Sequence, residues 1–233
     1  MGCDIHIYTE VKKEGKWRAI QVPNGWKKYL EGCLERATKQ DSINYYKARL
    51  EEEPDKVYEG IYSGRNYDLF AILANVRNRY GFRPISMPKG LPEDISETVE
   101  LEAEEWAGDG HSHSYHTLQD LLDYDWKQET KHRGWVDEKT YKNFKETGNP
   151  YPHSREVSGM NVVHLTNKQM DDLIAGKVPR QEGKRYYTQI EWKETYEESA
   201  GNFVSETIPA LQTIAEEYGV SNDEVRIVFW FDS

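Results

Sequence analysis

Only two cysteines, Cys3 and Cys33, occur among the 233 residues, and they form no CxxC pair. A disulfide framework and a cysteine-bound zinc site are therefore not expected. The start of the chain has no basic region followed by an apolar stretch, and no segment approaches membrane-spanning length. We therefore expect no signal peptide, no membrane partner and a cytoplasmic location with reduced thiols.

Basic residues are also in deficit, since 30 Lys and Arg stand against 41 Asp and Glu, which gives a net charge of −11. Proteins that grip polynucleotide backbones normally carry a basic face, so we expect no non-specific nucleic-acid binding. A small anion held by a local cluster of donors is compatible with this charge. The sequence contains no P-loop, dinucleotide fingerprint, GxSxG elbow or HExxH motif.

Hydrophobic residues make up only 37% of the chain, but seven Trp and sixteen Tyr can supply large buried areas. Apolar residues alternate with polar ones over residues 4–10 and 186–192, residues 160–165 also have the composition of a strand, and residues 225–231 are almost wholly apolar. This pattern predicts an α+β fold. We expect a mixed β-sheet with central N- and C-terminal strands, helices packed on it and long polar loop insertions.

The length suits a single domain over residues 1–233. Within it, residues 26–58 are predicted to form a charged helical excursion, and residues 124–158, rich in Gly and Pro, a loop or lid. A helix with apolar residues from Leu69 to Tyr80 is expected to end at Gly81, a typical C′ glycine.

Asp4 and His6 form the first candidate site. Residues two apart on a strand project to the same face, so this pair can ligate a divalent metal or form a general base oriented by its carboxylate. The alternative is the exposed face of a two-sided strand.

A second candidate site is the histidine-rich stretch that contains His111, His113 and His116. In an extended backbone His111 and His113 share a face, and imidazole with carboxylate suits zinc or manganese. The preceding Gly108-Asp109-Gly110 permits unusual backbone angles. A solvent-exposed histidine-rich loop is the alternative.

The third candidate site comprises Arg65, Asn66, Tyr67 and Asp68 at a predicted helix start. Unpaired N–H groups favour an anion there, and Arg65 adds a bidentate donor for phosphate or carboxylate. A local cap with an Asp68–Arg65 ion pair is equally compatible with the pattern.

Together these segments describe a metal or phosphate centre, with Zn, Mn or Mg as the candidate ion. His6, His111 and His113 are the candidate catalytic residues, Arg65, Asn66, Tyr67 and Tyr115 would bind a ligand, and the candidate metal ligands are Asp4, His6, Asp68, His111 and His113.

Four blocks of the sequence carry a resemblance: MGCDIH at residues 1–6, GRNYDLF at 64–70, DGHSHS at 109–114 and VFWFD at 228–232. They resemble a family of small proteins carried by tailed bacteriophages and prophages. The resemblance implies a viral protein that works in the bacterial host cytoplasm. Phage accessory proteins of this size often counter host defences, including nucleotide second messengers.

Three functions are compatible with these patterns. The first is a metal-dependent phosphoesterase, a hydrolase acting on a phosphorylated small molecule or nucleotide. The second is a nucleotide-binding sponge that sequesters such a ligand unchanged, with Tyr67, Tyr115 and Trp106 stacking a base. The third is a protein–protein inhibitor of a host factor. A homo-oligomer is compatible with all three.

Overall fold

The structure is a computed structural model that describes residues 2–232, and the chain divides into two compact units. The second unit is Lys127–Thr195, inserted between the two parts of the first. Each unit has its own cluster of buried apolar side chains. The two units are therefore described separately.

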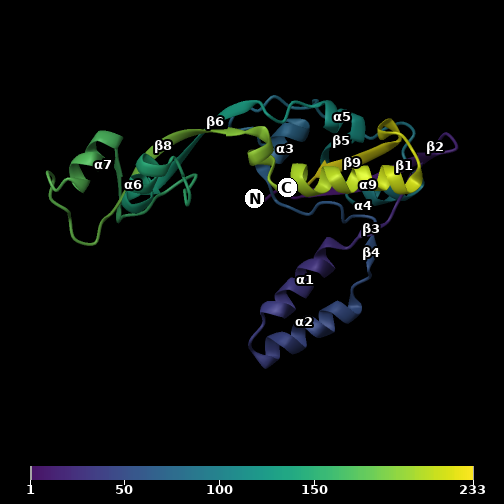
Figure 1. Ribbon diagram of the computed structural model, residues 1–233, viewed down its shortest axis with the longest axis horizontal. Helices are drawn as coiled ribbons and strands as arrows, with labels where there is room; N and C mark the ends of the chain where they lie inside the picture. Colours follow the sequence, from purple (N-terminus) through teal and green to yellow (C-terminus); the bar gives the residue numbers. More distant parts are fainter. Residues whose placement is uncertain (1, 233) are drawn as a thin grey trace. The chain divides into compact units, whose positions relative to one another are not determined.

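A four-stranded antiparallel sheet organises the first unit (Figure 1). Its strand order is β2-β1-β9-β5, so the first and last strands of the chain lie side by side in the middle, as expected. The β1–β2 hairpin turns at Glu14 and Gly15, both with positive φ. The strands are β1 (Ile5–Lys13), β2 (Lys16–Ala19), β5 (His111–Thr117) and β9 (Val225–Phe231).

Both faces of this sheet are covered. The larger core lies on the face of Ile7 and Phe229, against α3, α5 and α9. On the opposite face, Tyr8, Val228 and Trp230 pack against Val99 of α4. The helices, with a π-helix and a 3₁₀ turn, are α3 (Tyr67–Ala74), α4 (Glu97–Glu105), α5 (Leu118–Asp123), α8 (Tyr196–Ala200), the π-helix Phe203–Thr207, α9 (Ile208–Tyr218) and the 3₁₀ turn Asn222–Glu224.

A buried ion pair crosses the two central strands. Arg226 of β9 donates from Nε to Oε2 of Glu10 on β1 at 2.6 Å, and both side chains are almost fully buried. The same guanidinium reaches Asp94 at 2.7 Å and lies 3.9 Å from the Trp17 ring. The second carboxylate oxygen of Glu10 accepts from the Ser96 backbone N–H. This network satisfies both buried charges.

The helical excursion expected over residues 26–58 contains two helices, α1 (Gly25–Arg36) and α2 (Gln40–Glu52). A short two-stranded ribbon, β3 (Val22–Pro23) with β4 (Lys56–Val57), lies at the base of this helical hairpin. Across these two fully described helices, only the Leu30 side chain is buried.

Helix α3 ends earlier than the sequence predicts. The chain leaves the helix at Asn75, which adopts the left-handed conformation with φ 59°, rather than at Gly81. Asn tolerates this conformation better than other residues with a Cβ atom. Residues 76–82 then form a turn held by the Asn78 amide, which bonds both the N–H and the carbonyl of Phe82.

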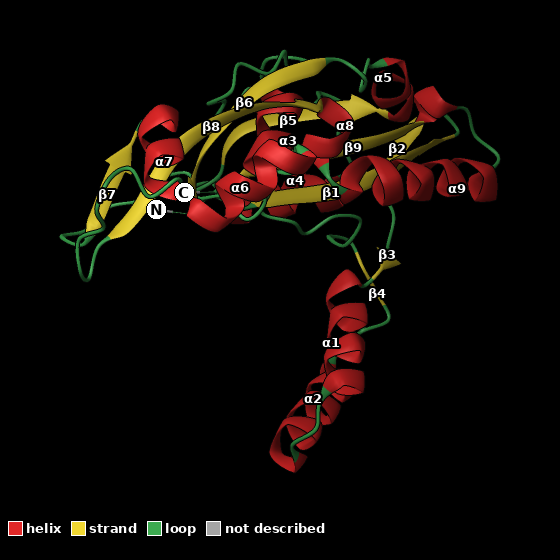
Figure 2. Ribbon diagram, turned by 60° about the vertical axis from the view of Figure 1, so that its left-hand side comes forward, coloured by secondary structure: helices red, strands yellow, loops and turns green. Residues whose placement is uncertain are grey.

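The second unit contains a three-stranded mixed sheet in the order β6-β8-β7 (Figure 2). The β6–β8 pair is antiparallel and the β7–β8 pair parallel, and α6 and α7 pack on one face. The elements are β6 (Glu129–Asp137), α6 (Glu138–Thr147), β7 (Val162–Leu165), α7 (Asn167–Ile174) and β8 (Arg185–Thr195).

The prediction of a loop or lid over residues 124–158 is wrong, because this segment contains β6 and α6. Along β6, the buried positions are His132, Gly134 and Val136, and charged or half-buried residues alternate with them. The strand period is present, but a histidine and a glycine occupy two of its three inward positions. That composition concealed the strand, since Gly is depleted in strands and His is no marker of a core.

Candidate functional site around His6

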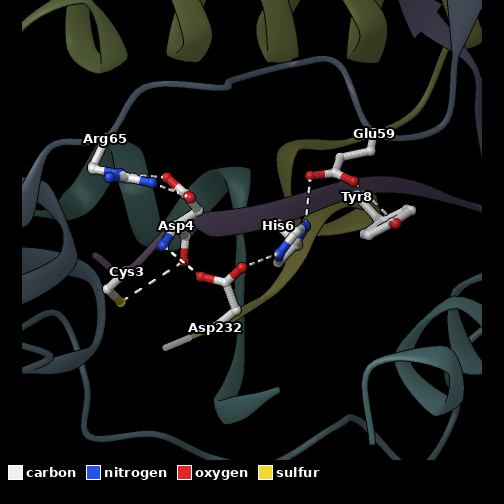
Figure 3. A network of polar contacts seen from close by, with 7 residues as sticks. All are labelled: Cys3, Asp4, His6, Tyr8, Glu59, Arg65 and Asp232. Carbon is white, nitrogen blue, oxygen red and sulfur yellow. Dashed lines mark hydrogen bonds and ion pairs between the residues drawn. The ribbon is translucent and has the colours of Figure 1, made fainter. Parts of the chain in front are cut away.

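The paired ends of β1 and β9 form the site's backbone. His6 lies directly across from Trp230, and beyond the next pair, Ile5 and Phe231, Asp4 and Asp232 face each other. The Asp4 N–H donates to Oδ1 of Asp232 at 2.7 Å, and the Asp232 N–H donates to the Asp4 carbonyl at 3.2 Å. The sheet therefore fixes two carboxylates beside one imidazole (Figure 3).

His6 lies between two carboxylates. Its Nδ1 is 2.9 Å from Oε1 of Glu59 and its Nε2 is 3.6 Å from Oδ2 of Asp232, as Figure 3 shows. The residue is only 8% exposed, and the Trp106 ring lies over it at 4.0 Å between centroids. Burial lowers the pKa of His6, but the two carboxylates together outweigh burial and leave it raised. The ring is thus biased toward the charged imidazolium.

Tyr8 extends the network on the same strand face. Its hydroxyl lies 3.3 Å from Glu59 and 3.1 Å from Oε2 of Glu102 on α4. Burial raises the pKa of Tyr8, and the two carboxylates raise it further, so the phenol keeps its proton. An isolated backbone bridge between Tyr8 and Glu59 fixes the position of Glu59 beside the strand.

Arg65 is paired with Asp4 rather than with Asp68. Its Nε donates to Oδ1 of Asp4 at 2.6 Å, and a second guanidinium nitrogen reaches Oδ2. The hydrogen bonds from Arg65 hold the pKa of the Asp4 carboxyl below its usual range. A Cβ atom at Gly2 would lie 2.6 Å from this guanidinium, so the glycine leaves room for it. An incoming anion has to compete with Asp4 for Arg65.

The start of α3 holds the N-terminal segment in place. Asn66 caps the helix by accepting from the N–H groups of Asp68 and Leu69, and its amide donates to the Ser199 carbonyl at 2.8 Å. The Tyr67 hydroxyl accepts from the Cys3 N–H at 3.2 Å. Asn66 and Tyr67, expected to bind a ligand, therefore make structural contacts here, and Asp68 lies in the helix's first turn.

The prediction that His111 and His113 share a face is wrong, because β5 contains a bulge between His111 and Ser114. Ser112 has a positive φ of 54°. The His111 ring packs on Phe231, 6.1 Å between centroids, whereas the His113 ring stacks on Trp230 at 5.6 Å. Phe231 and Trp230 are consecutive in β9 and face opposite sides of the sheet.

The other two predicted residues of this strand also have defined surroundings. His116 is buried, its Nε2 lies 2.9 Å from the Leu73 carbonyl, and burial lowers its pKa to about 4, as is typical of a core histidine. Tyr115 is half-buried on the opposite face, with the Lys89 ammonium 4.0 Å from its ring.

The predicted metal ligands are not gathered into one centre. His6 and His113 share a face but lie on strands separated by β9, and both stack on Trp230. Among residues 2–232, no group of three or more His, Cys, Asp or Glu side chains is arranged to hold a metal ion. The predicted ligands are Asp4, His6, Asp68, His111 and His113.

The sequence did not single out Glu59, Glu102 or Asp232, whereas Trp106, expected to stack a base, lies over His6. Asp232 could have been found, since antiparallel pairing of the first and last strands places it opposite Asp4. Glu59 lies in an irregular segment, and Glu102 is one of several glutamates on α4. Neither position has a local sequence pattern that would have marked it.

A buried imidazole between two carboxylates can donate a proton near neutral pH and recover it, as a general acid does. Comparison with family models, curated proteins and solved structures finds no match to this chain. Of the helices that the structure describes, none has the length and apolar character needed to cross a membrane.

Proposed function

We propose that the protein acts on a phosphorylated small molecule or nucleotide at the site around His6, with His6 as the general acid. The observation that supports this is the position of the imidazole, buried between Glu59 and Asp232 with its pKa raised. An imidazolium that is charged near neutral pH can protonate the leaving oxygen of a phosphate ester. This proton transfer assists cleavage most when the departing alkoxide is a poor leaving group.

The step requires one proton donor and one anion contact. Nε2 of His6 is buried and lies 3.6 Å from Asp232, beyond ordinary hydrogen-bond length, so its proton has no close partner. A substrate would have to open the cover over the ring to reach it. Arg65 would contact the phosphate by exchanging Asp4 for it. Water adds to phosphorus, the ester P–O bond breaks, the leaving oxygen takes the proton of His6, and the attacking water returns one.

The step as written uses no divalent metal. Carboxylate and imidazole are donor types that zinc, manganese and magnesium accept. The described residues, however, offer no group of three such side chains around one point, and Glu59 is engaged with both His6 and Tyr8. The proposal therefore assigns no role to a metal ion.

The test compares His6→Gln with His111→Gln, which lies on the other face of the sheet. Hydrolysis of bis(p-nitrophenyl) phosphate, nucleoside triphosphates and cyclic dinucleotides is followed with and without manganese or a chelator. We expect wild-type turnover of at least one substrate, loss of about 100-fold or more in His6→Gln, and normal turnover in His111→Gln. Undiminished turnover in His6→Gln would reject the general-acid role.

Binding without turnover is the second candidate function. The Trp106 ring covers His6, which is only 8% exposed, so little of the imidazole is accessible to a substrate. A protein that sequesters a nucleotide needs only affinity. If the protein only sequesters its ligand, the ligand extracted from the denatured complex should have the same mass as the ligand that was added. Recovery of a cleaved product would exclude pure sequestration.

A further inference from the structure

Charge is distributed unevenly between the two units. The second unit, Lys127–Thr195, contains 13 Lys and Arg against 10 Asp and Glu, whereas the rest of the chain contains 17 against 31. The first unit therefore carries a net charge of −14 and the second unit one of +3. An anionic ligand that the first unit repels is attracted by the second.

An open groove of about 640 Å³ indents the second unit. It lies where β6 ends, α6 begins and the chain enters β8. This volume is within the range of sites that hold small ligands. Five cationic side chains line the groove: Lys139, Lys142, Arg180, Lys184 and Arg185.

Two of the groove's three carboxylates are already engaged within the unit. Asp137 caps α6 by accepting from the Thr140 N–H at 2.8 Å. Glu138 is shared by two cations, Lys142 at 2.9 Å and Arg180 at 2.5 Å, whose hydrogen bonds lower its pKa. The third is Glu146, near the end of α6.

Two cations of the groove are available to a ligand. Within the described chain, Lys139 and Arg185 make no ion pair, and both are exposed. Arg185 opens β8 and Lys139 lies in the first turn of α6. A guanidinium and an ammonium at one groove can hold a phosphate chain between them.

The groove also has an aromatic wall. Tyr186 and Tyr187 line it, and the Tyr186 hydroxyl is fixed by the Gln181 N–H, which donates to it at 2.7 Å. Tyr187 is half-buried and lies directly across from Asp137, another residue that lines the groove. A half-buried tyrosine ring can stack with a planar base.

We propose that this groove is a nucleotide-binding site, with Lys139 and Arg185 holding the phosphates and Tyr187 stacking on the base. The cations supply the charge that an anionic ligand needs, and the ring distinguishes a nucleotide from phosphate alone. The site is separate from the one around His6 and does not depend on its activity.

The test uses the full chain and adenosine triphosphate as the probe, with binding measured by calorimetry at 50 and 200 mM salt. Lys139→Gln combined with Arg185→Gln is expected to weaken binding at least about tenfold, because two charge-assisted contacts are lost. The matched control is Lys168→Gln combined with Lys177→Gln, which removes the same charge on and just after α7 and should change affinity less than about twofold.

Three further results decide the proposal. Tyr187→Leu should weaken binding of adenosine triphosphate but leave inorganic tripolyphosphate unchanged, and equal losses would overturn the stacking role. His6→Gln should bind the probe normally, which separates this site from the proposed function. Absence of binding to the wild type, or equal weakening in both double variants that retain the wild-type circular dichroism spectrum, would overturn the groove as a site.

Discussion

Replacing Glu59 by Gln tests whether His6 is held charged by its neighbours. The amide can still accept a hydrogen bond from Tyr8 or His6, so the shape of the site is retained while its negative charge is lost. Burial then disfavours the charged form of His6, and of its two carboxylate partners only Asp232 remains to stabilise it. We expect the pKa of His6 to fall relative to the wild type, and the fall to be larger when Asp232→Asn is added.

The loss of stability expected for Glu59→Gln depends on how exposed the Glu59 side chain is. A hydrogen bond between charged partners contributes roughly 1.5–3 kcal/mol when buried. The Glu59 side chain is 37% exposed, so solvent screening reduces the contribution to about 1 kcal/mol. For a chain of this length that corresponds to a melting temperature lower by about 2–4 °C.

The dependence on pH has a definite sign. The pKa of His6 is raised in the folded state, so its favourable interactions are fully present below the unfolded value near 6.5. They are lost as the pH rises through the folded pKa. Glu59→Gln should therefore destabilise the protein more at pH 5.5 than at pH 9.

Two measurements check this reasoning. NMR titration of the imidazole reports the pKa of His6, and thermal unfolding at the two pH values reports the stability. Glu105→Gln, an exposed residue at the end of α4, is the matched control and should change neither. An unchanged His6 pKa in Glu59→Gln, or equal destabilisation at both pH values, would refute the electrostatic account of the site.

The remaining predictions concern stability and are measured by urea or thermal unfolding. Glu10→Ala should cost about 3 kcal/mol, because the buried Arg226 loses its buried carboxylate partner and keeps only the largely exposed Asp94 carboxylate, and a cost below about 1 kcal/mol would contradict the role of the pair. Asp4→Asn should leave the melting temperature unchanged, since Asp4 and Arg65 are both about half exposed, and a clear drop would contradict this. Asn75→Val should cost at least about 1 kcal/mol because of its positive φ, whereas Asn75→Gly should cost little.

The fold of the first unit could be predicted because its patterns are local. The apolar run from Val225 to Phe231 predicts a buried strand, and Thr117 before Leu118 predicts a capped helix. The structure contains both. The ends of elements were harder to predict, since α3 ends at Asn75, where a residue other than glycine adopts the left-handed conformation.

The candidate site could be predicted only in part, because the residues that surround Asp4 and His6 come from distant parts of the sequence. Asp4 and His6 were selected from strand alternation, and both belong to the site. The bulge at Ser112 separates His111 from His113, and a bulge inserts one residue without changing the residue types around it. Prediction from strand alternation assumes an unbroken period of two, so it cannot detect the inserted residue.

Net charge of the whole chain is a poor guide to ligands when its units differ in sign. The expectation of no non-specific nucleic-acid binding rests on the net charge of −11, which combines −14 on the first unit with +3 on the second. Electrostatic attraction falls off within about 8–10 Å at physiological salt. A ligand at the groove therefore responds to Lys139 and Arg185 rather than to acidic residues more than a screening length away, and local charge decides which class of ligand each unit can bind.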